Sequence, residues 1–122
     1  MKYALIAIAI LAAAGVAWYL TRKPPSPMIV IRPTYDGPIS QYQGGKTLLV
    51  AVYAPWASVW RATSEALAGV DHSRYDLAMI DADRDRQAVR DLGVEIIPTV
   101  LVFREGKEIA RLPNMMSLDQ LP

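Results

Sequence analysis

The longest hydrophobic stretch of the chain runs from Tyr3 to Leu20 without a charged residue. As a helix rising about 1.5 Å per residue, it would extend roughly 27 Å, close to the hydrocarbon thickness of a bilayer. Tyr3 stands at one end and Trp18 and Tyr19 at the other, where aromatic side chains of membrane helices meet the interface. The pattern predicts a single transmembrane signal-anchor helix over residues 1–22.

Two properties of this helix stay open. The small residues at 15–17 are also compatible with a cleaved signal peptide, although the length of the run and the aromatic pair that follows favour an uncleaved anchor. Arg22 and Lys23 flank the span at the membrane interface. They balance Lys2 and the terminal amine, so the charges do not decide the orientation.

One face of the predicted helix carries Ala9, Ala13 and Ala17 at four-residue spacing. Such a stripe lets another helix approach closely, and it also arises by chance in an alanine-rich helix. The prolines of the next segment, residues 23–27, favour an extended linker that would hold the following domain close to the membrane.

From residue 28 onward, short apolar runs alternate with segments of helical periodicity. The apolar runs, several rich in β-branched residues, predict strands at 28–31, 48–54, 75–81, 99–103 and 107–112. Helical spacing and turn signals predict helices at 58–67 and after the acidic residues at 83–85, with short helical turns at 39–43 and 117–121. Strands that alternate with helices and end in a hairpin predict an α/β domain with a mixed sheet over residues 28–122.

The helix at 58–67 is expected to turn its small and aliphatic residues, Val59, Ala62, Ala66 and Leu67, toward the sheet.

Composition narrows the possible chemistry. The formal net charge of +1, from 13 basic and 12 acidic residues, indicates no nucleic-acid footprint. The 122 residues include no cysteine, which excludes disulfides, thiolate nucleophiles and thiolate-bound metals. Because there is one histidine, His72, and no phosphate-binding or dinucleotide motif, no cofactor is expected.

Four segments together resemble the thioredoxin family. They are the strand, turn and helix start at 48–61, the strand end at 79–83, the segment around Ile-Pro-Thr at 93–99 and the hairpin at 102–106. The resemblance implies a thioredoxin-like fold over residues 28–122, with Pro98 in the cis form. Trp56 matches the tryptophan that precedes the Cys-Gly-Pro-Cys motif of the family.

The sequence departs from the family where redox chemistry occurs. Ala57 and Trp60 stand in the two cysteine positions. The buried acid that assists proton transfer in the family corresponds to Ala51, and the lysine often paired with it corresponds to Leu77. Thiol–disulfide exchange needs a thiolate, so a redox-inactive protein that is not an enzyme is expected.

Other chemistry at this place is less favoured by the sequence. Ser58 has no base placed beside it by sequence, and it is expected to be the helix N-cap or a first-turn residue. His72 follows the helix in a polar loop, where a lone histidine is more often solvated than catalytic. Asp81, Asp83 and Asp85 lack the pattern of a calcium loop and are interpreted as acids at a helix N-terminus, so no metal is expected.

Two features near Pro98 suit binding. With Pro98 in the cis form, the resemblance implies that the Ile97 backbone can pair with an extended segment. Trp56 and Trp60 flank this place, and tryptophan is enriched at interface hot spots. The alternative is that Trp60 turns inward and fills core volume.

The short C-terminal end bears on how one face of the sheet is covered. Residues 117–122 allow little more than one helical turn, whereas the closing helix of the family covers one sheet face. That face is expected to be partly exposed or covered by something else. Met115 and Met116 beside it suit either an adaptable contact surface or the core.

These observations predict a redox-inactive, membrane-anchored thioredoxin-like protein that binds protein partners as an accessory or assembly subunit of a membrane complex. The alternative is a holdase or chaperone-like module that binds extended polypeptide beside Pro98. A third hypothesis is an enzyme that uses Ser58 or His72. By analogy with anchored bacterial members of the family, we expect a single-pass protein of the inner (cytoplasmic) membrane with a periplasmic domain. Arg22 and Lys23 argue mildly for the opposite orientation.

Overall fold

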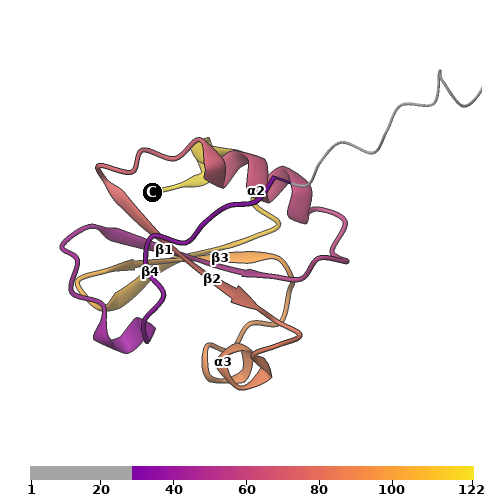
Figure 1. Ribbon diagram of the computed structural model, residues 1–122, viewed down its shortest axis with the longest axis horizontal. Helices are drawn as coiled ribbons and strands as arrows, with labels where there is room; N and C mark the ends of the chain where they lie inside the picture. The colour runs from indigo at the N-terminus through magenta and orange to yellow at the C-terminus, as the bar shows by residue number, and fades with distance from the viewer. Residues whose placement is uncertain (1–28) are drawn as a thin grey trace, which may run out of the picture.

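A four-stranded mixed sheet is the frame of the described part of the chain, residues 29–122 of a computed structural model. Its strands are β1 (Thr47–Tyr53), β2 (Tyr75–Asp81), β3 (Thr99–Arg104) and β4 (Lys107–Pro113), in the spatial order β2-β1-β3-β4 (Figure 1). β1 and β2 are parallel, whereas β3 is antiparallel to both β1 and β4. The predicted α/β fold with a mixed sheet is confirmed.

The predicted membrane anchor over residues 1–22 and the linker over 23–27 lie outside the described residues. Within residues 29–122, no helix combines the length and the hydropathy that a membrane span requires.

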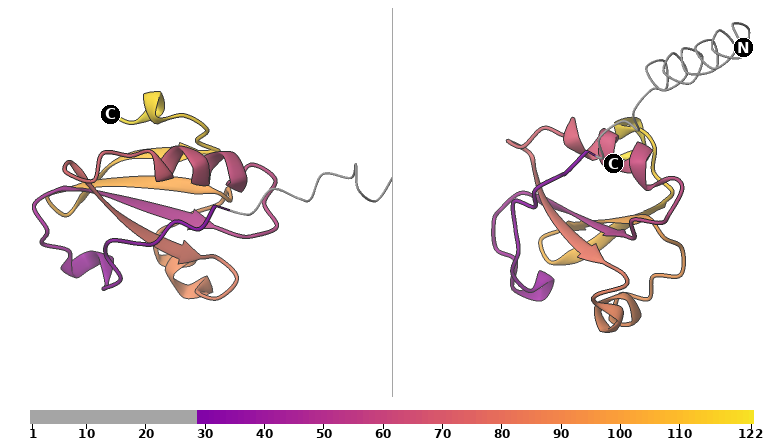
Figure 2. Two further views of the ribbon diagram at one scale, coloured as in Figure 1. Left: turned by 45° about the horizontal axis from the view of Figure 1, so that its top comes forward. Right: turned by 45° about the vertical axis from the view of Figure 1, so that its right-hand side comes forward.

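Each face of the sheet is covered by different segments (Figure 2). One face packs against α2 (Trp60–Ala68) and the C-terminal segment with the 3₁₀ turn η2 (Leu118–Gln120). The other face packs against the N-terminal loop with η1 (Ile39–Gln41) and against the segment of α3 (Arg86–Asp91). The apolar run of β1 is buried on both faces, which explains why its side chains do not alternate with polar ones.

The pairing of strands places Ala51 at the centre of the sheet. Ala51 lies opposite Met79 of β2 and Val100 of β3. The hairpin from β3 to β4 turns at Glu105 and Gly106, which both have positive φ (53° and 76°). The predicted turn at this position is therefore confirmed.

The strand predicted at 28–31 is wrong for the described residues, because residues 29–31 join no ladder. The first backbone bonds to the sheet come later, where the N–H groups of Thr34 and Tyr35 both donate to the carbonyl oxygen of Leu77, at 2.8 and 3.1 Å. Pro33 has no N–H to donate, and Val30 is 80% exposed. A β-branched composition alone does not create a strand where the chain leaves the sheet edge.

The helix predicted at 58–67 begins two residues later and buries a different face. α2 starts at Trp60, and its N-cap is Val59, which makes no side-chain cap bond. The buried residues are Trp60, Thr63, Ser64 and Leu67, whereas Val59, Ala62 and Ala66 are half-buried. These four buried residues follow the helical spacing i, i+3, i+4, i+7. Two of them, Thr63 and Ser64, are polar, so a search for apolar residues alone does not find this face of the helix.

The short C-terminal segment covers more of the core than its length suggests. Met115 is fully buried, and Leu118 and Leu121 pack against the same core cluster. The Oγ1 of Thr63 donates to the carbonyl oxygen of Met115 at 2.5 Å, which ties this segment to α2. The central strands β1 and β3 are therefore covered on this face. Of the neighbours Met115 and Met116, only Met116 faces solvent, with 62% of its surface exposed.

Candidate functional site

The connection from β1 to α2 is a pair of tight turns. The N–H of Ala57 donates to the carbonyl oxygen of Ala54, and the N–H of Trp60 donates to that of Ala57, both at 3.1 Å. Ser58 lies exposed within the second turn and is neither N-cap nor a first-turn residue of α2. The predicted role of Ser58 is therefore wrong, because the helix begins only after the turn that contains it.

Trp60 turns inward from the start of α2. It is 4% exposed and stacks on Tyr53, with ring centroids 4.6 Å apart and planes 20° apart. Ala57 is 8% exposed and belongs to the same core cluster, together with Ala51 and Leu77. Among residues 29–122 the buried polar side chains are Thr63, Ser64 and Thr99, and none of them carries a charge. The site is thus packed as ordinary hydrophobic core.

Trp56 has the opposite environment. It is 69% exposed, and its Nε1 donates to a carboxylate oxygen of Asp83 at 2.9 Å. This bond fixes the indole against the loop that follows β2. Of the two predicted contact tryptophans, the structure leaves only Trp56 accessible.

Asp81, the last residue of β2, and Asp83 and Asp85 after it have separate structural roles. Asp81 accepts from the N–H of Asp83 at 3.0 Å and pairs with Arg84 at 3.7 Å. Asp85 caps α3 by accepting from the N–H of Ala88 at 3.1 Å. The interpretation of these acids as helix N-terminal residues is confirmed for Asp85. Among the described residues no cluster of acids and histidine is arranged to hold a metal ion.

The Ile97–Pro98 peptide bond is cis, as expected. The carbonyl oxygen of Pro98 accepts from the N–H of Asn114 at 2.9 Å, which joins this segment to the end of β4. Ile97 is half-buried and packs against the cluster that contains Ala57 and Trp60. Its own N–H and C=O have no backbone partner within residues 29–122. The structure therefore brings Ile97 and Pro98 to the core around Ala57 and Trp60.

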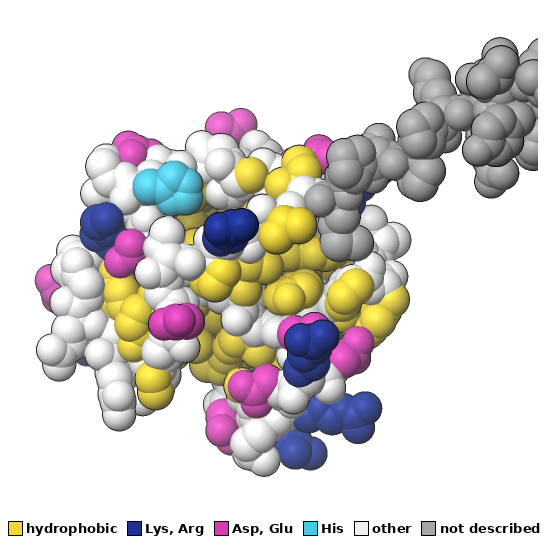
Figure 3. Space-filling model, in the orientation of Figure 1, with side chains coloured by type: hydrophobic (Ala, Val, Ile, Leu, Met, Phe, Trp, Pro, Cys, Tyr) yellow, Lys and Arg dark blue, Asp and Glu magenta, His cyan; other side chains and the backbone are white. Residues whose placement is uncertain are grey.

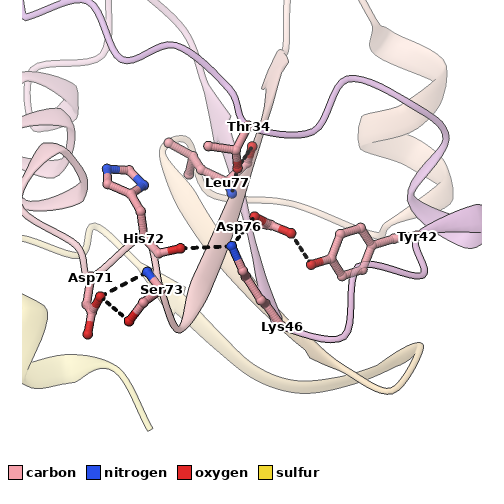
Figure 4. A network of polar contacts seen from close by, with 8 residues as sticks. All are labelled: Thr34, Tyr42, Lys46, Asp71, His72, Ser73, Asp76 and Leu77. Atoms are coloured by element: carbon pink, nitrogen blue, oxygen red, sulfur yellow. Dashed lines mark hydrogen bonds and ion pairs between the residues drawn. The ribbon is translucent and has the colours of Figure 1, made fainter.

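The polar loop around His72 is held by backbone and carboxylate contacts (Figure 4). His72 takes part through its carbonyl oxygen, which accepts from the Nζ of Lys46 at 3.0 Å. Asp71 accepts from the N–H and the hydroxyl of Ser73, at 2.9 and 2.7 Å, and these bonds lower the pKa of its carboxyl. Asp71, His72 and Ser73 therefore form a turn, and within residues 29–122 no carboxylate or hydroxyl is hydrogen-bonded to the imidazole.

Two residues of this region were missed by sequence reasoning. Tyr53 is the aromatic partner of Trp60, and Thr63 connects α2 to the C-terminal segment. The sequence could have indicated that Thr63 is buried, because it lies one helical turn after Trp60 and therefore on the same face of α2. Tyr53 ends a strand, and its contact with α2 depends on the geometry of the intervening turn.

Comparisons with known proteins agree with this architecture. The thioredoxin family model matches residues 28–122. Thioredoxin of Fasciola hepatica is 28% identical, with a TM-score of 0.50, and the match covers 57% of this chain and 68% of that one. Trxlp of Edwardsiella tarda EIB202 is 23% identical, with a TM-score of 0.55 and coverage of 61% and 76%. Thioredoxin-2, described as a component of malaria parasite protein secretion machinery, is 19% identical, with a TM-score of 0.56 and the same coverage.

Proposed function

The chain belongs to the thioredoxin family, and from that premise we propose that it is a redox-inactive, membrane-anchored member acting as a protein-interaction or assembly subunit of a membrane complex. The observation that carries this proposal is the burial of Ala57 and Trp60, which stand in the two cysteine positions. Exchange of disulfides needs an accessible thiolate. A packed aromatic stack in its place supports a scaffold whose outer surface makes the contacts.

The membrane part of the proposal rests on the sequence. The uncharged run from Tyr3 to Leu20 supports an anchor, and its alanine stripe supports a contact with another membrane helix. We place the domain on the periplasmic side by analogy with anchored members of the family. Thioredoxin-2 of the malaria parasite, as a component of secretion machinery, is a precedent for this fold within an assembly, and at 19% identity the likeness extends to the fold alone.

Gentle solubilisation of the native membrane tests the proposal. The tagged full chain is expected to migrate as part of a larger complex, with defined proteins that co-purify in constant ratio. A chain in which residues 1–22 are replaced by an unrelated single-span helix is the matched control: kept partners assign the contact to the domain, and lost partners assign it to the anchor. Recovery of both chains solely as free monomers would contradict the proposal. Protease accessibility in spheroplasts tests the orientation.

A second candidate function is a holdase that binds extended polypeptide at the segment before Pro98. The observation that favours it is the unpaired N–H and C=O of Ile97 within the described residues. An unfolded peptide would then change the amide signal of Ile97 and the fluorescence of the chain through Trp56, which is exposed. A Trp56→Phe chain separates the contribution of Trp56 from those of Trp18 and the buried Trp60. No change in either signal at millimolar peptide would eliminate this candidate.

A further inference from the structure

The exposed hydrophobic side chains of the domain are concentrated at one end of the sheet. Within residues 29–122, the large hydrophobic side chains that are exposed are Ile29, Val30, Trp56, Ile96, Ile109 and Met116. Trp56 follows the last residue of β1, Ile96 precedes the first residue of β3, and Met116 follows the last residue of β4, each by three residues. The location of these three therefore follows from where the strands begin and end.

Strand register brings these strand ends together. Thr99, which begins β3, lies opposite Val52 near the end of β1 and opposite Pro113 at the end of β4. Tyr53 lies opposite Asp81, the last residue of β2. The three hydrophobic residues beyond these strand ends consequently belong to the same end of the sheet.

The first described residues join them. Ile29 and Val30 line an apolar groove of about 290 Å³ together with Tyr53 and Asp81, which end β1 and β2. In Figure 3, hydrophobic side chains gather near the place where the described chain begins, with acidic and basic side chains around them. Of the exposed hydrophobic set within residues 29–122, only Ile109 lies elsewhere, in β4. We call the surface formed by the other five the apolar end: Ile29, Val30, Trp56, Ile96 and Met116.

The opposite end of the sheet is polar. Leu48 lies opposite Phe103, so the loop before β1 meets the hairpin from β3 to β4 there. A cavity of about 390 Å³ at this end is lined by Lys46, Arg104 and Glu105, among others, and by none of the exposed hydrophobic residues of the described chain. The domain thus has one polar and one apolar end.

The charges at the apolar end do not form a basic patch. Asp81 pairs with Arg84 at 3.7 Å, and Glu95 is exposed nearby in the chain before β3. Asp83 accepts from the Nε1 of Trp56 at 2.9 Å, so the exposed indole ring has no unmet hydrogen-bond donor. This end therefore offers apolar contact and not an attraction to anionic headgroups.

We propose that the apolar end rests on the lipid surface of the membrane that holds the predicted anchor, with Val30 and Trp56 among the headgroups. Tryptophan favours this interface, and exposed apolar patches with a polar rim mark such contacts. The side chains come from four separate segments and spread over the end, whereas hot spots for a protein partner cluster around a central pocket. The inference rests on the proposed function insofar as it requires the anchor.

The short tether favours this orientation. Residues 21–28 separate the predicted span from Ile29, and even fully extended they reach at most roughly 30 Å. A domain of this size has a diameter of roughly 30 to 35 Å. The polar end therefore reaches the bilayer only when the tether is at its full length, whereas the apolar end, where the chain enters the domain, reaches it at any extension.

Spin labels on the full chain in vesicles test the contact. The chain has no cysteine, so a nitroxide can be attached to a single introduced one. Ser58→Cys and Met116→Cys place the label at the apolar end, and Lys107→Cys places it toward the polar end as the matched control, all at exposed positions. The probe is a vesicle of phosphatidylcholine with a water-soluble nickel complex on both sides.

A domain that is docked about nine-tenths of the time should lower the nickel collision rate at labels 58 and 116 about tenfold relative to label 107. Equal collision rates at all three labels would overturn the inference.

Substitutions identify the side chains that make the contact. Trp56→Ser, read through the label at 116, should lower the ratio of docked to free domain about tenfold, the effect of one large apolar side chain that leaves the interface. Val30→Ser should act in the same direction, and it decides should Trp56→Ser fail to fold. Ile109→Ser is the matched control, because Ile109 is exposed outside the apolar end, and it should leave the ratio unchanged. An equal loss with Ile109→Ser would contradict docking through this end.

Lipid composition separates apolar docking from attraction to charge. Vesicles with added phosphatidylglycerol should give the same collision rates at low and high salt, since the apolar end carries acids beside Arg84. Docking that occurs only on the anionic vesicles would refute the apolar contact.

The outcomes also separate this inference from the proposed function. The vesicles contain no partner protein, so accessible labels at 58 and 116 refute docking and leave the subunit role standing. Labels that are shielded only in native membranes refute it as well, and they assign the apolar end to a protein partner. If the chain does not float with the vesicles, the predicted anchor is wrong, and docking fails together with the membrane part of the proposed function.

Discussion

Trp60 lies against Tyr53 in a stacked arrangement, with ring centroids 4.6 Å apart and ring planes 20° apart. Because Tyr53 ends β1 and Trp60 begins α2, the stack joins the strand to the helix across the turn between them. The consequence is an apolar, buried junction between the strand and the helix.

Truncation of this stack should destabilise the protein strongly. Trp60→Ala removes a side chain that is 4% exposed, and such changes cost about 3–5 kcal/mol in the free energy of unfolding. Trp56→Ala is the control: that side chain is 69% exposed and makes one exposed hydrogen bond, so the cost should stay below about 1 kcal/mol. Urea unfolding of the full chain in detergent measures both, and equal costs would contradict the inward packing of Trp60.

A cysteine returned to position 57 should be a poor nucleophile. The side chain of Ala57 is 8% exposed and belongs to the apolar core cluster, conditions that raise a thiol pKa and hinder access. The positive end of the α2 dipole stabilises a thiolate by about 0.3–1 kcal/mol, which lowers the thiol pKa by less than one unit.

The comparison is therefore between Ala57→Cys and Ser58→Cys, since Ser58 is exposed. At neutral pH the thiol introduced at position 57 should react with iodoacetamide at least about tenfold more slowly than the thiol at position 58. A rise of one unit in the thiol pKa, or an equal effect of restricted access, gives this difference. Faster alkylation at 57 would show that the site still activates a thiol.

The hydroxyl of Thr63 should hold the C-terminal segment in place. Its Oγ1 donates to the carbonyl oxygen of Met115 inside the core, and Thr63→Val leaves that carbonyl without its partner at a cost of about 1–3 kcal/mol. Hydrogen exchange in the segment 115–122 should accelerate correspondingly. Thr63→Ser keeps the hydroxyl and should retain most of the protection; if it loses as much as Thr63→Val, packing and not the hydrogen bond is responsible.

Stability should depend on pH above about 10 through Tyr42. Burial, followed by the hydrogen bond to Asp76, raises the pKa of Tyr42 from 10.0 to about 12. A raised folded pKa means that the stabilising contribution is complete below pH 10 and is lost as the pH rises from 10 to about 12.

Tyr42→Phe should therefore flatten the decline of the melting temperature over this interval. Tyr35→Phe, which removes a hydroxyl bonded to the carbonyl oxygen of Pro38, is the control and should keep the decline. The same slope in wild type and Tyr42→Phe would show that Tyr42 does not titrate in this range.

Local signals in the sequence were sufficient for most elements. The hairpin at Glu105 and Gly106, the acid-capped α3 and the apolar β1 each follow from residues adjacent in the chain. The family resemblance added the cis bond before Pro98. The strand expected at 28–31 failed because pairing depends on a neighbour in space, and residues 29–31 pass the edge of β2 without joining it.

By itself, the sequence determined that the domain is an α/β fold of the thioredoxin family without a thiol, since strand periodicity, turn residues and the lack of cysteine are properties of the chain. Only the tertiary structure decided that Trp60 lies inside and Trp56 outside, because one position meets the volume beside Tyr53 and the other meets solvent and Asp83.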